Sequence, residues 1–471
     1  MIGRIEEIKA LRAAYNSEYS EFVAVYGRRR IGKTFLVNEV FNYSFAFHAS
    51  GAEGASRRMQ LSAFREALIR QGHAECPRLA SWVEAFSQLE AFLGGMPSGK
   101  KVVFLDELPW FDTPCSGFLK AFELFWNGWA TSRKDILLVI CGSATTWIVN
   151  KILSSRGGLH NRVTRQIRLS PFTLGECEAY ADYLHLDFDR SQILECYMVF
   201  GGVAYYWSLL QEGQSAVQNI DRLFFGADGL MRNEFKRLFS SLFKMDARYV
   251  EIVRMLGRRQ SGMSRSEIIS AIEGTSGGDV STCLSELVEC GFLLESRPIG
   301  RKKKGTTYQL IDPYVLFFFS FVEPWKGNDH RHWTLNYHSP ATNSWRGHAF
   351  ERVCLLHPGQ LRRALGIEGV EADFYSWRWK SDNPDEKGVQ IDLLIDRADR
   401  IVDLCEIKYS EAPYQLDREE YENICRRIEV FRRESGIRKA IQTVLIAANG
   451  VAPGKYRGHI QREVTGNDLF G

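Results

Sequence analysis

Short apolar runs alternate with amphipathic stretches through the first 170 residues of the chain. The runs are rich in β-branched and aromatic residues, and the stretches between them have the length and spacing of helices. This alternation predicts a parallel sheet covered by helices, so we expect residues 1–170 to form an α/β domain. The predicted strands are 21–27, 45–50, 101–107 and 135–143.

The pattern changes after Pro171. Helical periodicity replaces the strand signal over 171–243, which predicts an all-helical lid subdomain. Three amphipathic segments and two short β-rich segments follow within 244–325, an order typical of a winged helix and a connector. The pattern over residues 326–471 predicts a second α/β domain. The whole chain is therefore expected to be a multidomain α/β protein. The expected elements of this last domain are strands near 390–396, 401–407 and 441–447 and a helix over 419–435.

Composition narrows the class of protein. Of the 471 residues, 45% are hydrophobic and 25% are charged, which excludes a mostly disordered or fibrous chain. The 60 Lys and Arg against 57 Asp and Glu give a net charge of +3, too balanced to predict nucleic-acid binding by itself. The 10 cysteines form no close pairs, and the longest apolar run, 315–322, is too short for a membrane span. We therefore expect a cytoplasmic protein without membrane contact.

A nucleotide-binding loop is predicted between the first strand and the helix that follows it. Residues 27–34 match the pattern G-x-x-x-x-G-K-[ST], in which glycines let the backbone amides face phosphates at a helix N-terminus. We expect Lys33 to bridge the β- and γ-phosphates of ATP and Thr34 to ligate Mg²⁺. The predicted nucleotide contacts of this loop are Gly27, Arg28, Arg29, Arg30, Ile31, Gly32, Lys33, Thr34 and Phe35.

Two adjacent acids end the predicted strand at 101–107. Neighbouring strand residues point to opposite sides, so we assign Asp106 to Mg²⁺ and Glu107 to the attacking water. Ser143, at the end of another strand, is predicted to sense the γ-phosphate, with a helix cap as the alternative. Arg162 or Arg165 is a candidate arginine finger acting on a second subunit of a homo-oligomer. An exposed arginine at a helix end is the alternative interpretation.

These motifs together resemble the STAND-type branch of the AAA+-related ATPases, specifically archaeal and bacterial ATPases with a DUF234-type C-terminal region. The resemblance covers essentially the whole chain and implies that Gly3 and Arg4 lie near the adenine. One departure concerns the lid, where the family usually has Gly-Gly-x-Pro before an aromatic residue and this chain has Ala204 in place of the Pro. The segments that carry the resemblance are Gly3-Arg4 with its acidic helix, the phosphate loop, FLDE (104–107), Gly142-Ser143, Pro171-Phe172 and GGVAYY (201–206).

The predicted winged helix has a basic hairpin tip, formed by Arg301, Lys302, Lys303 and Lys304, where a wing would follow a DNA backbone. The predicted recognition helix, 279–291, is acidic, which disfavours phosphate contact. DNA contact is therefore one interpretation of this segment. A solvated turn or a protein interface is the other.

A second acidic constellation lies near the C-terminus. Glu406 and Lys408 are two residues apart, so on a strand they project from the same face. Asp392 precedes Glu406 by 14 residues, enough for a hairpin whose strands lie about 4.8 Å apart, so both carboxylates can ligate one Mg²⁺. Lys408 would then polarise the attacking water or stabilise the charge on the phosphorus centre. The alternative is an ordinary surface ion cluster.

With Glu351 upstream in a predicted helix, this arrangement resembles the PD-(D/E)xK restriction-endonuclease-like fold of the same C-terminal family. The resemblance places Glu351, Asp392, Glu406 and Lys408 at the active-site positions, with Gln390 beside the Asp and Ile391 in place of the customary Pro. The predicted function is a Mg²⁺-dependent ATPase switch that gates a DNA-directed nuclease-like domain, in DNA processing or defence. The alternative is an ATP-regulated signalling scaffold whose last domain recruits a protein partner without cleavage.

Overall fold

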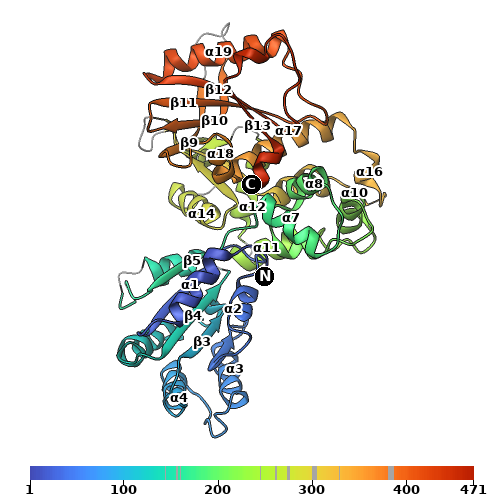
Figure 1. Cartoon of the computed structure of the whole chain (residues 1–471). Coiled ribbons are helices and arrows are strands. Elements are labelled where there is room, and N and C mark those ends of the chain that lie inside the picture. The colour runs from blue at the N-terminus through green and yellow to red at the C-terminus, as the bar shows by residue number, and fades with distance from the viewer. Residues whose placement is uncertain are drawn as a thin grey trace. The chain divides into compact units, whose positions relative to one another are not determined.

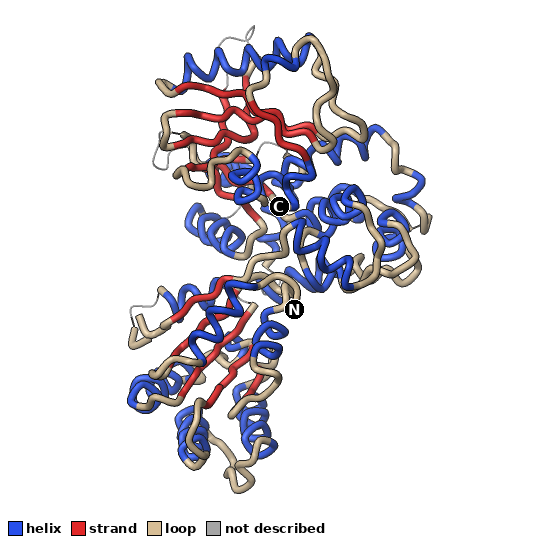
Figure 2. The backbone as a smooth tube through the Cα atoms, viewed as in Figure 1, coloured by secondary structure: helices blue, strands red, loops and turns tan. Residues whose placement is uncertain are grey.

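A computed structural model gives the architecture of the chain (Figures 1 and 2). It divides into two compact units, Met1–Pro171 and Phe172–Gly471, and each is described by itself. The basic tip predicted at Arg301, Lys302, Lys303 and Lys304 lies outside the described residues. The described residues are 1–143, 145–154, 157–159, 161–243, 246–259, 262–272, 276–299, 305–327, 329–379 and 387–471.

The first unit contains a five-stranded, wholly parallel sheet in the order β2-β3-β4-β1-β5. The predicted parallel sheet is therefore confirmed, and β4 separates the strand before the phosphate loop from the strand that ends in Asp106. β5 was not predicted from the sequence, because this short edge strand carries three polar residues in four. The strands are β1 (Glu21–Tyr26), β2 (Phe47–Ser50), β3 (Lys101–Asp106), β4 (Ile136–Gly142) and β5 (Arg165–Arg168).

Helices cover both faces of this sheet, because alternate residues of its buried strands point to opposite sides. Val23 of β1 packs in a core with α1 and α2, whereas Ala24 packs in a core with α3, α4 and α5. The helices are α1 (Ile5–Tyr15), α2 (Lys33–Val40), α3 (Arg57–Arg70), α4 (Trp82–Gly94), α5 (Phe118–Leu124) and α6 (Thr145–Ile148), with the short helices η1 (Leu108–Trp110), η2 (Phe125–Trp129), η3 (Ala130–Ser132) and η4 (Val149–Leu153).

The second unit begins with helices, as the periodicity of 171–243 predicted. Gly202 lies against the start of this unit: the Phe172 backbone N–H donates to Gly202 O at 2.7 Å, and a Cβ at Gly202 would lie 1.9 Å from Phe172 O. Glycine is therefore required in the Gly201-Gly202 pair by close backbone approach. The helices are α7 (Leu174–Tyr183), α8 (Arg190–Phe200), α9 (Ala204–Trp207), α10 (Ala216–Ile220), η5 (Asp221–Phe225) and α11 (Glu234–Phe243).

Three helices and a small antiparallel sheet follow, in the element order that the sequence predicted. The sheet has the order β6-β8-β7, so the hairpin β7-β8 is extended by a two-residue strand that precedes the second helix. These elements are α12 (Ala247–Gly257), β6 (Met263–Ser264), α13 (Arg265–Ala271), α14 (Gly277–Glu289), β7 (Leu293–Ser296) and β8 (Thr307–Leu310). Connecting helices are α15 (Pro313–Phe317), η6 (Phe318–Val322), α16 (His332–Leu335), α17 (Pro340–Leu356) and α18 (Pro358–Ala364).

The chain ends in a five-stranded mixed sheet of order β13-β12-β11-β10-β9. β9, β10 and β11 are antiparallel, as predicted for the last two, and β11, β12 and β13 are parallel. The two edge strands, β9 and β13, were not predicted from the sequence, because most of their residues are only half-buried and polar side chains interrupt the apolar ones. The elements are β9 (Ala372–Trp379), β10 (Val389–Arg397), β11 (Ile401–Lys408), α19 (Arg418–Ser435), β12 (Ala440–Ala447), η7 (Arg457–His459), β13 (Arg462–Thr465) and η8 (Gly466–Phe470).

One face of this sheet packs against α19, and the other belongs to a core shared with the helices of the lid region. Leu393 and Cys405 of the sheet lie in the same buried cluster as Phe200 and Phe224 of the helical segment. One large apolar core thus joins the helical segment to the C-terminal sheet, and smaller apolar clusters lie between that sheet and α19. In the described part of the chain, no helix is both long and apolar enough to cross a bilayer.

Candidate nucleotide and metal sites

The phosphate loop joins β1 to α2 and depends on two glycines. Gly27 has φ +142°, and a Cβ there would lie 2.3 Å from the carbonyl oxygen of Leu169, the residue that follows β5. Gly32 has φ +91° and precedes the first residue of α2 in a left-handed conformation that L side chains rarely adopt. The loop therefore delivers its backbone to the N-terminus of α2, where amide groups favour anions.

Lys33 is the buried cation of this loop. Its Nζ donates to Gly27 O at 3.0 Å and to Arg28 O at 2.7 Å. Burial lowers the pKa of Lys33, against the nearby negative charges of Glu107 and Asp106, which raise it. A buried cation requires an oppositely charged or hydrogen-bonding partner, and the negative charge of a polyphosphate would supply one.

Thr34 and Asp106 meet at the end of the sheet. The Thr34 hydroxyl lies 3.0 Å from Asp106 Oδ2 and 3.2 Å from Oδ1, so it donates to this carboxylate. Burial and the neighbouring Glu107 raise the pKa of Asp106. Cys141 of β4 also interacts with Asp106 and lowers its pKa, an interaction that was not predicted from the sequence. A hydroxyl and a carboxylate at one point are oxygen ligands that suit Mg²⁺, so these residues fit the implied metal.

Glu107 follows Asp106 in a left-handed conformation, with φ 47°, which is uncommon for a residue with a side chain. Its Oε2 accepts from the Ser143 hydroxyl at 2.9 Å and from the Ser143 backbone N–H at 3.1 Å. β4 lies directly beside β3 and delivers Ser143 to this contact. The structure therefore brings together the two residues predicted to act on the attacking water and the γ-phosphate.

The remaining residues predicted to contact nucleotide lie within the phosphate loop or directly beside it. Arg4, which is 7% exposed, donates to Ile31 O at 3.4 Å, so the segment containing Gly3 and Arg4 borders the phosphate loop. Arg28 is buried, Arg29 lies 3.9 Å from Glu53, and Arg30 has φ 69°. Phe35, on α2, is exposed. A contact of Arg4 with adenine stays a prediction.

Arg162 and Arg165 lie at the other end of the sheet from the phosphate loop. Thr164 N–H donates to Phe22 O near the start of β1, and Arg165 Nε lies 3.9 Å from Glu21, the first residue of that strand. Arg162 itself is exposed. Because β1 runs from Glu21 to Tyr26 before the loop begins, neither arginine is near the nucleotide site of its own chain. An arginine finger from either residue requires a second copy and stays a prediction.

In the C-terminal sheet, Asp392 of β10 interacts with acidic residues of two other elements, α17 and β11. It accepts from Gln390 Nε2 at 2.6 Å. Burial and the negative charge of Glu351 on α17 raise the pKa of Asp392, and the charge of Glu406 on β11 adds to this effect. Three of the four predicted nuclease-like residues therefore interact electrostatically, although they come from a helix and two strands. Asp392 lies within β10, which begins at Val389 where it pairs with β9.

Glu406 and Lys408 project together from β11, with Lys408 Nζ 2.9 Å from Glu406 Oε1. Burial would raise the pKa of Glu406, but Lys408 and Arg427 together lower it. Two residues of α19 complete this cluster: Arg427 pairs with Glu406, and Glu420 lies 2.9 Å from Lys408. Neither residue was predicted from the sequence, although their separation of seven residues places them on one helix face.

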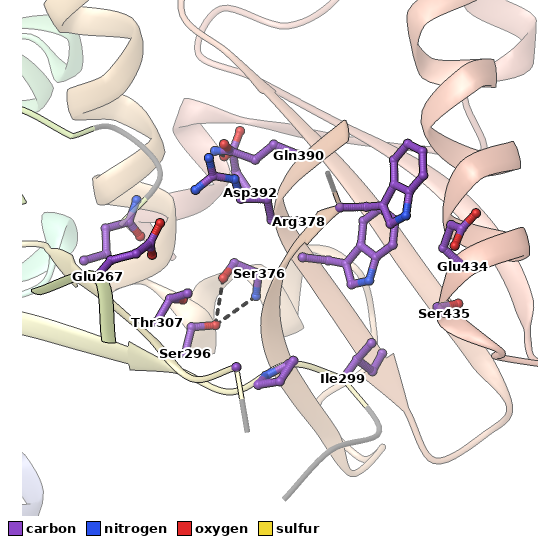
Figure 3. Close-up of a pocket in the computed structure, with 15 residues that line it drawn as sticks. Glu267, Ser296, Ile299, Thr307, Ser376, Arg378, Gln390, Asp392, Glu434 and Ser435 are labelled. Atoms are coloured by element: carbon purple, nitrogen blue, oxygen red, sulfur yellow. Dashed lines mark hydrogen bonds between the residues drawn. The ribbon is translucent and has the colours of Figure 1, made fainter. Parts of the chain in front are cut away.

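A bulge in β10 shapes the surroundings of Asp392. The register with β9 shifts between Ile391 and Leu394, so Asp392 and Leu393 together oppose Ser376. The backbone N–H of Ser376 donates instead to the Ser296 hydroxyl of β7 at 3.0 Å, and the two hydroxyls lie 2.9 Å apart (Figure 3). A bulge re-aims side chains and interrupts pairing, and here it leaves Ser376 of β9, the strand next to the one that carries Asp392, free to bond to the small hairpin.

A pocket of about 440 Å³ opens beside this bulge, between the hairpin and β9. Figure 3 shows Asp392 and Gln390 close to Arg378 on its wall, with Glu267 of α13 across from them. Asp392 is therefore reached from a cavity. This arrangement combines a carboxylate, a cation and hydrogen-bonding groups at one surface.

The negative charge of Glu351, Asp392 and Glu406 favours a divalent metal at these residues. The repulsion between Asp392, Glu351 and Glu406 is the kind that a cation relieves, and Mg²⁺ commonly uses only one or two protein carboxylates. In the part of the chain that the structure describes, however, no three His, Cys, Asp or Glu side chains are grouped so as to hold a metal ion. The geometry thus supports at most a two-carboxylate site.

Comparisons with known proteins place the fold. No family model matches the chain. The uncharacterised protein MJECL04 of Methanocaldococcus jannaschii is 24% identical over 333 residues, 69% of each chain. The Walker-type ATPase PABY2304 of Pyrococcus abyssi matches with a TM-score of 0.50 and 17% identity, over 68% of this chain and 96% of that one. ORC2 of Aeropyrum pernix matches with a TM-score of 0.42 and 12% identity, over 67% and 93%. The match to PABY2304 shows that this chain contains the fold of a Walker-type P-loop ATPase.

Proposed function

We propose that this protein is a Mg²⁺-dependent ATP hydrolase that uses nucleotide state as a switch. The observation that carries the proposal is the contact of Ser143 with Glu107 beside the paired Thr34 and Asp106, at the end of the sheet that bears the phosphate loop. The Walker-type fold and the motifs that resemble the STAND-type branch of AAA+-related ATPases support the same function.

Each residue of the site then has a distinct role. Lys33 and the amides at the start of α2 bind the phosphates, and Thr34 and Asp106 would hold Mg²⁺, which neutralises phosphate charge when bound. Glu107 orients the attacking water and accepts its proton. Ser143 fixes the Glu107 carboxylate through two hydrogen bonds, so the base is positioned before the substrate arrives.

Substitution of Glu107 tests this function. Glu107→Gln keeps the size of the side chain but removes the base, so we expect ATP binding to persist while turnover falls by about 10²-fold or more. Binding of a fluorescent ATP analogue and release of phosphate measure the two effects. Lys33→Ala is the comparison variant and should lose binding itself. Equal turnover of wild type and Glu107→Gln would contradict the assignment of the base.

As a second candidate function, we propose that the C-terminal domain is a DUF234-like, PD-(D/E)xK nuclease-like domain that cleaves DNA. The specific observation in its favour is that Glu351 and Glu406 lie near enough to Asp392 for their charges to raise its pKa, and that Asp392 lines a cavity. The pairing of Glu406 with both Lys408 and Arg427 favours the competing role, an interaction module that binds a protein partner without cleavage.

Asp392→Ala separates these two roles. If the domain cleaves, this change should abolish Mg²⁺-dependent cleavage of DNA and leave ATP hydrolysis intact, since the two sites share no residues. Cleavage of single- and double-stranded DNA is measured with ATP, with ADP and without nucleotide. Asp396→Ala, on the same strand, is the matched control. If wild type cuts no substrate under any of these conditions, the interaction-module role is supported.

The elements from α12 to β8 support a further part of the proposal, in which they form a winged helix that contacts DNA. Three helices and a three-stranded sheet are the elements of such a domain. We also propose a homo-oligomer, since the positions of Arg162 and Arg165 permit an arginine finger only toward another copy.

A further inference from the structure

A pocket of about 350 Å³ lies between the end of α12 and one side of α17, within the second unit. Arg258 and Arg259, which directly follow α12, line this pocket, and α17 contributes His348 and Arg352. No carboxylate is found among the described residues that line it. The pocket is thus a concave surface on which up to four cationic groups converge.

The two arginines that follow α12 are available to bind a ligand. Arg258 and Arg259 are exposed at the C-terminal end of the helix, and neither has an ion-pair partner among the described residues. Arg254, one turn earlier, is instead paired with Glu323 at 2.8 Å. Guanidinium groups bind phosphate oxygens in a bidentate manner, so this pair of arginines suits a phosphate group better than an apolar ligand.

Arg352 connects the pocket to the acidic cluster. It is 3% exposed, and its Nη1 donates to Glu351 Oε2 at 2.9 Å. Burial lowers the pKa of Arg352, whereas the charges of Glu351 and Asp392 raise it. His348 lies 3.4 Å from Glu351 on the same helix. An anion in the pocket would therefore contact two residues that themselves contact Glu351, one of the residues proposed to act in cleavage.

We propose that this pocket binds a phosphate group of a nucleic-acid strand and holds that strand beside Asp392. The proposal deepens the second candidate function and rests on it for the position of the scissile bond. Binding itself is independent of cleavage, because neither Arg258 nor Arg259 belongs to the acidic cluster.

The test is binding of a fluorescein-labelled single strand of about 12 nucleotides, followed by fluorescence anisotropy in EDTA at several salt concentrations. Arg258→Ala/Arg259→Ala should weaken binding at least about tenfold and reduce the salt slope by about 1.4, because each lost contact removes about 0.7. Arg258→Lys/Arg259→Lys, which keeps the charge, should restore the salt slope. Circular dichroism checks that each variant is folded.

Lys236→Ala/Arg237→Ala is the matched control, since it removes two exposed cations from α11 in the same unit. Equal weakening by the control and the pocket variant, or no weakening by the pocket variant, would overturn the proposal. If the pocket variant loses binding while wild type with Mg²⁺ cuts no DNA, the pocket stands and the cleavage proposal fails. If wild type cuts DNA and the pocket variant binds and cuts equally well, only the pocket proposal fails.

Discussion

At the scale of single residues, Glu107 shows how the fold prepares a reactive group. Its positive φ is unfavourable for a side-chain-bearing residue, yet it turns the carboxylate toward Ser143 on the neighbouring strand. Strain of this kind persists where the surrounding structure fixes it, and it is common at functional sites. Positioning of Glu107 therefore depends on β4 as well as on the strand that carries it.

This dependence predicts the effect of Ser143→Ala. Losing a hydrogen bond to a charged group costs about 1.5–3 kcal/mol, so we expect kcat for ATP to fall about tenfold to a hundredfold with little change in nucleotide affinity. Steady-state phosphate release and analogue binding measure the two quantities. Ser143→Thr retains the hydroxyl and should retain most of the activity. A fully active Ser143→Ala enzyme would show that the contact is only structural.

At the scale of elements, His357 joins α7 to the end of α17. Its Nε2 accepts from the Leu174 backbone N–H at 3.0 Å, and its Nδ1–H donates to Val353 O at 2.7 Å. The ring is therefore neutral, and burial lowers its pKa from 6.5 to about 4. The contact fixes the first turn of the helical segment to the helix that carries Glu351.

His357 makes the stability of the second unit depend on pH. As pH falls from 6.5 to about 4, the unfolded chain binds a proton that the folded chain excludes, so the free energy of unfolding decreases by about 3 kcal/mol at most. Urea unfolding between pH 7 and pH 4 measures this loss. His357→Phe should flatten the pH dependence but lower stability near pH 7, because Leu174 N–H loses its acceptor. The exposed residue His185 gives the control, His185→Asn, which should change neither.

At the scale of the whole molecule, a buried ion pair joins the helical segment to the C-terminal domain. Glu195 of α8 and Arg346 of α17 lie 3.3 Å apart, and their side chains are 6% and 1% exposed. Glu195 also accepts from Trp333 Nε1 at 3.2 Å and from the Tyr337 hydroxyl at 2.9 Å. Together with the shared apolar core, this network predicts that a displacement of α8 carries α17 and Glu351 with it.

Breaking the pair should destabilise the unit strongly. Arg346→Met leaves Glu195 without its cation in the core, and we expect a loss of about 3–5 kcal/mol in the free energy of unfolding. Adding Glu195→Gln removes the unpaired charge and should recover part of this loss. Chemical denaturation of the wild type, both single variants and the double variant measures the coupling. Additive effects of the two changes would contradict a direct interaction.

The extent of sequence-based prediction differed between the two sites. The phosphate loop, Asp106 and Glu107 are contiguous with their strands, so local pattern was enough to predict which residues occupy the end of the sheet. Glu406 and Lys408 were likewise predictable from the two-residue period of a strand. The partners Cys141, Arg427 and Glu420 were not, because each comes from an element whose packing no local pattern specifies.

The sequence by itself therefore determined the type and order of the main elements, because hydrophobic period and glycine position act over a few residues. Only the tertiary structure decided the strand order that places Ser143 against Glu107, the bulge at Asp392 and the pocket between α12 and α17. These features depend on contacts between residues far apart in the chain. Their energies come from burial and charge in three dimensions, which the linear pattern does not contain.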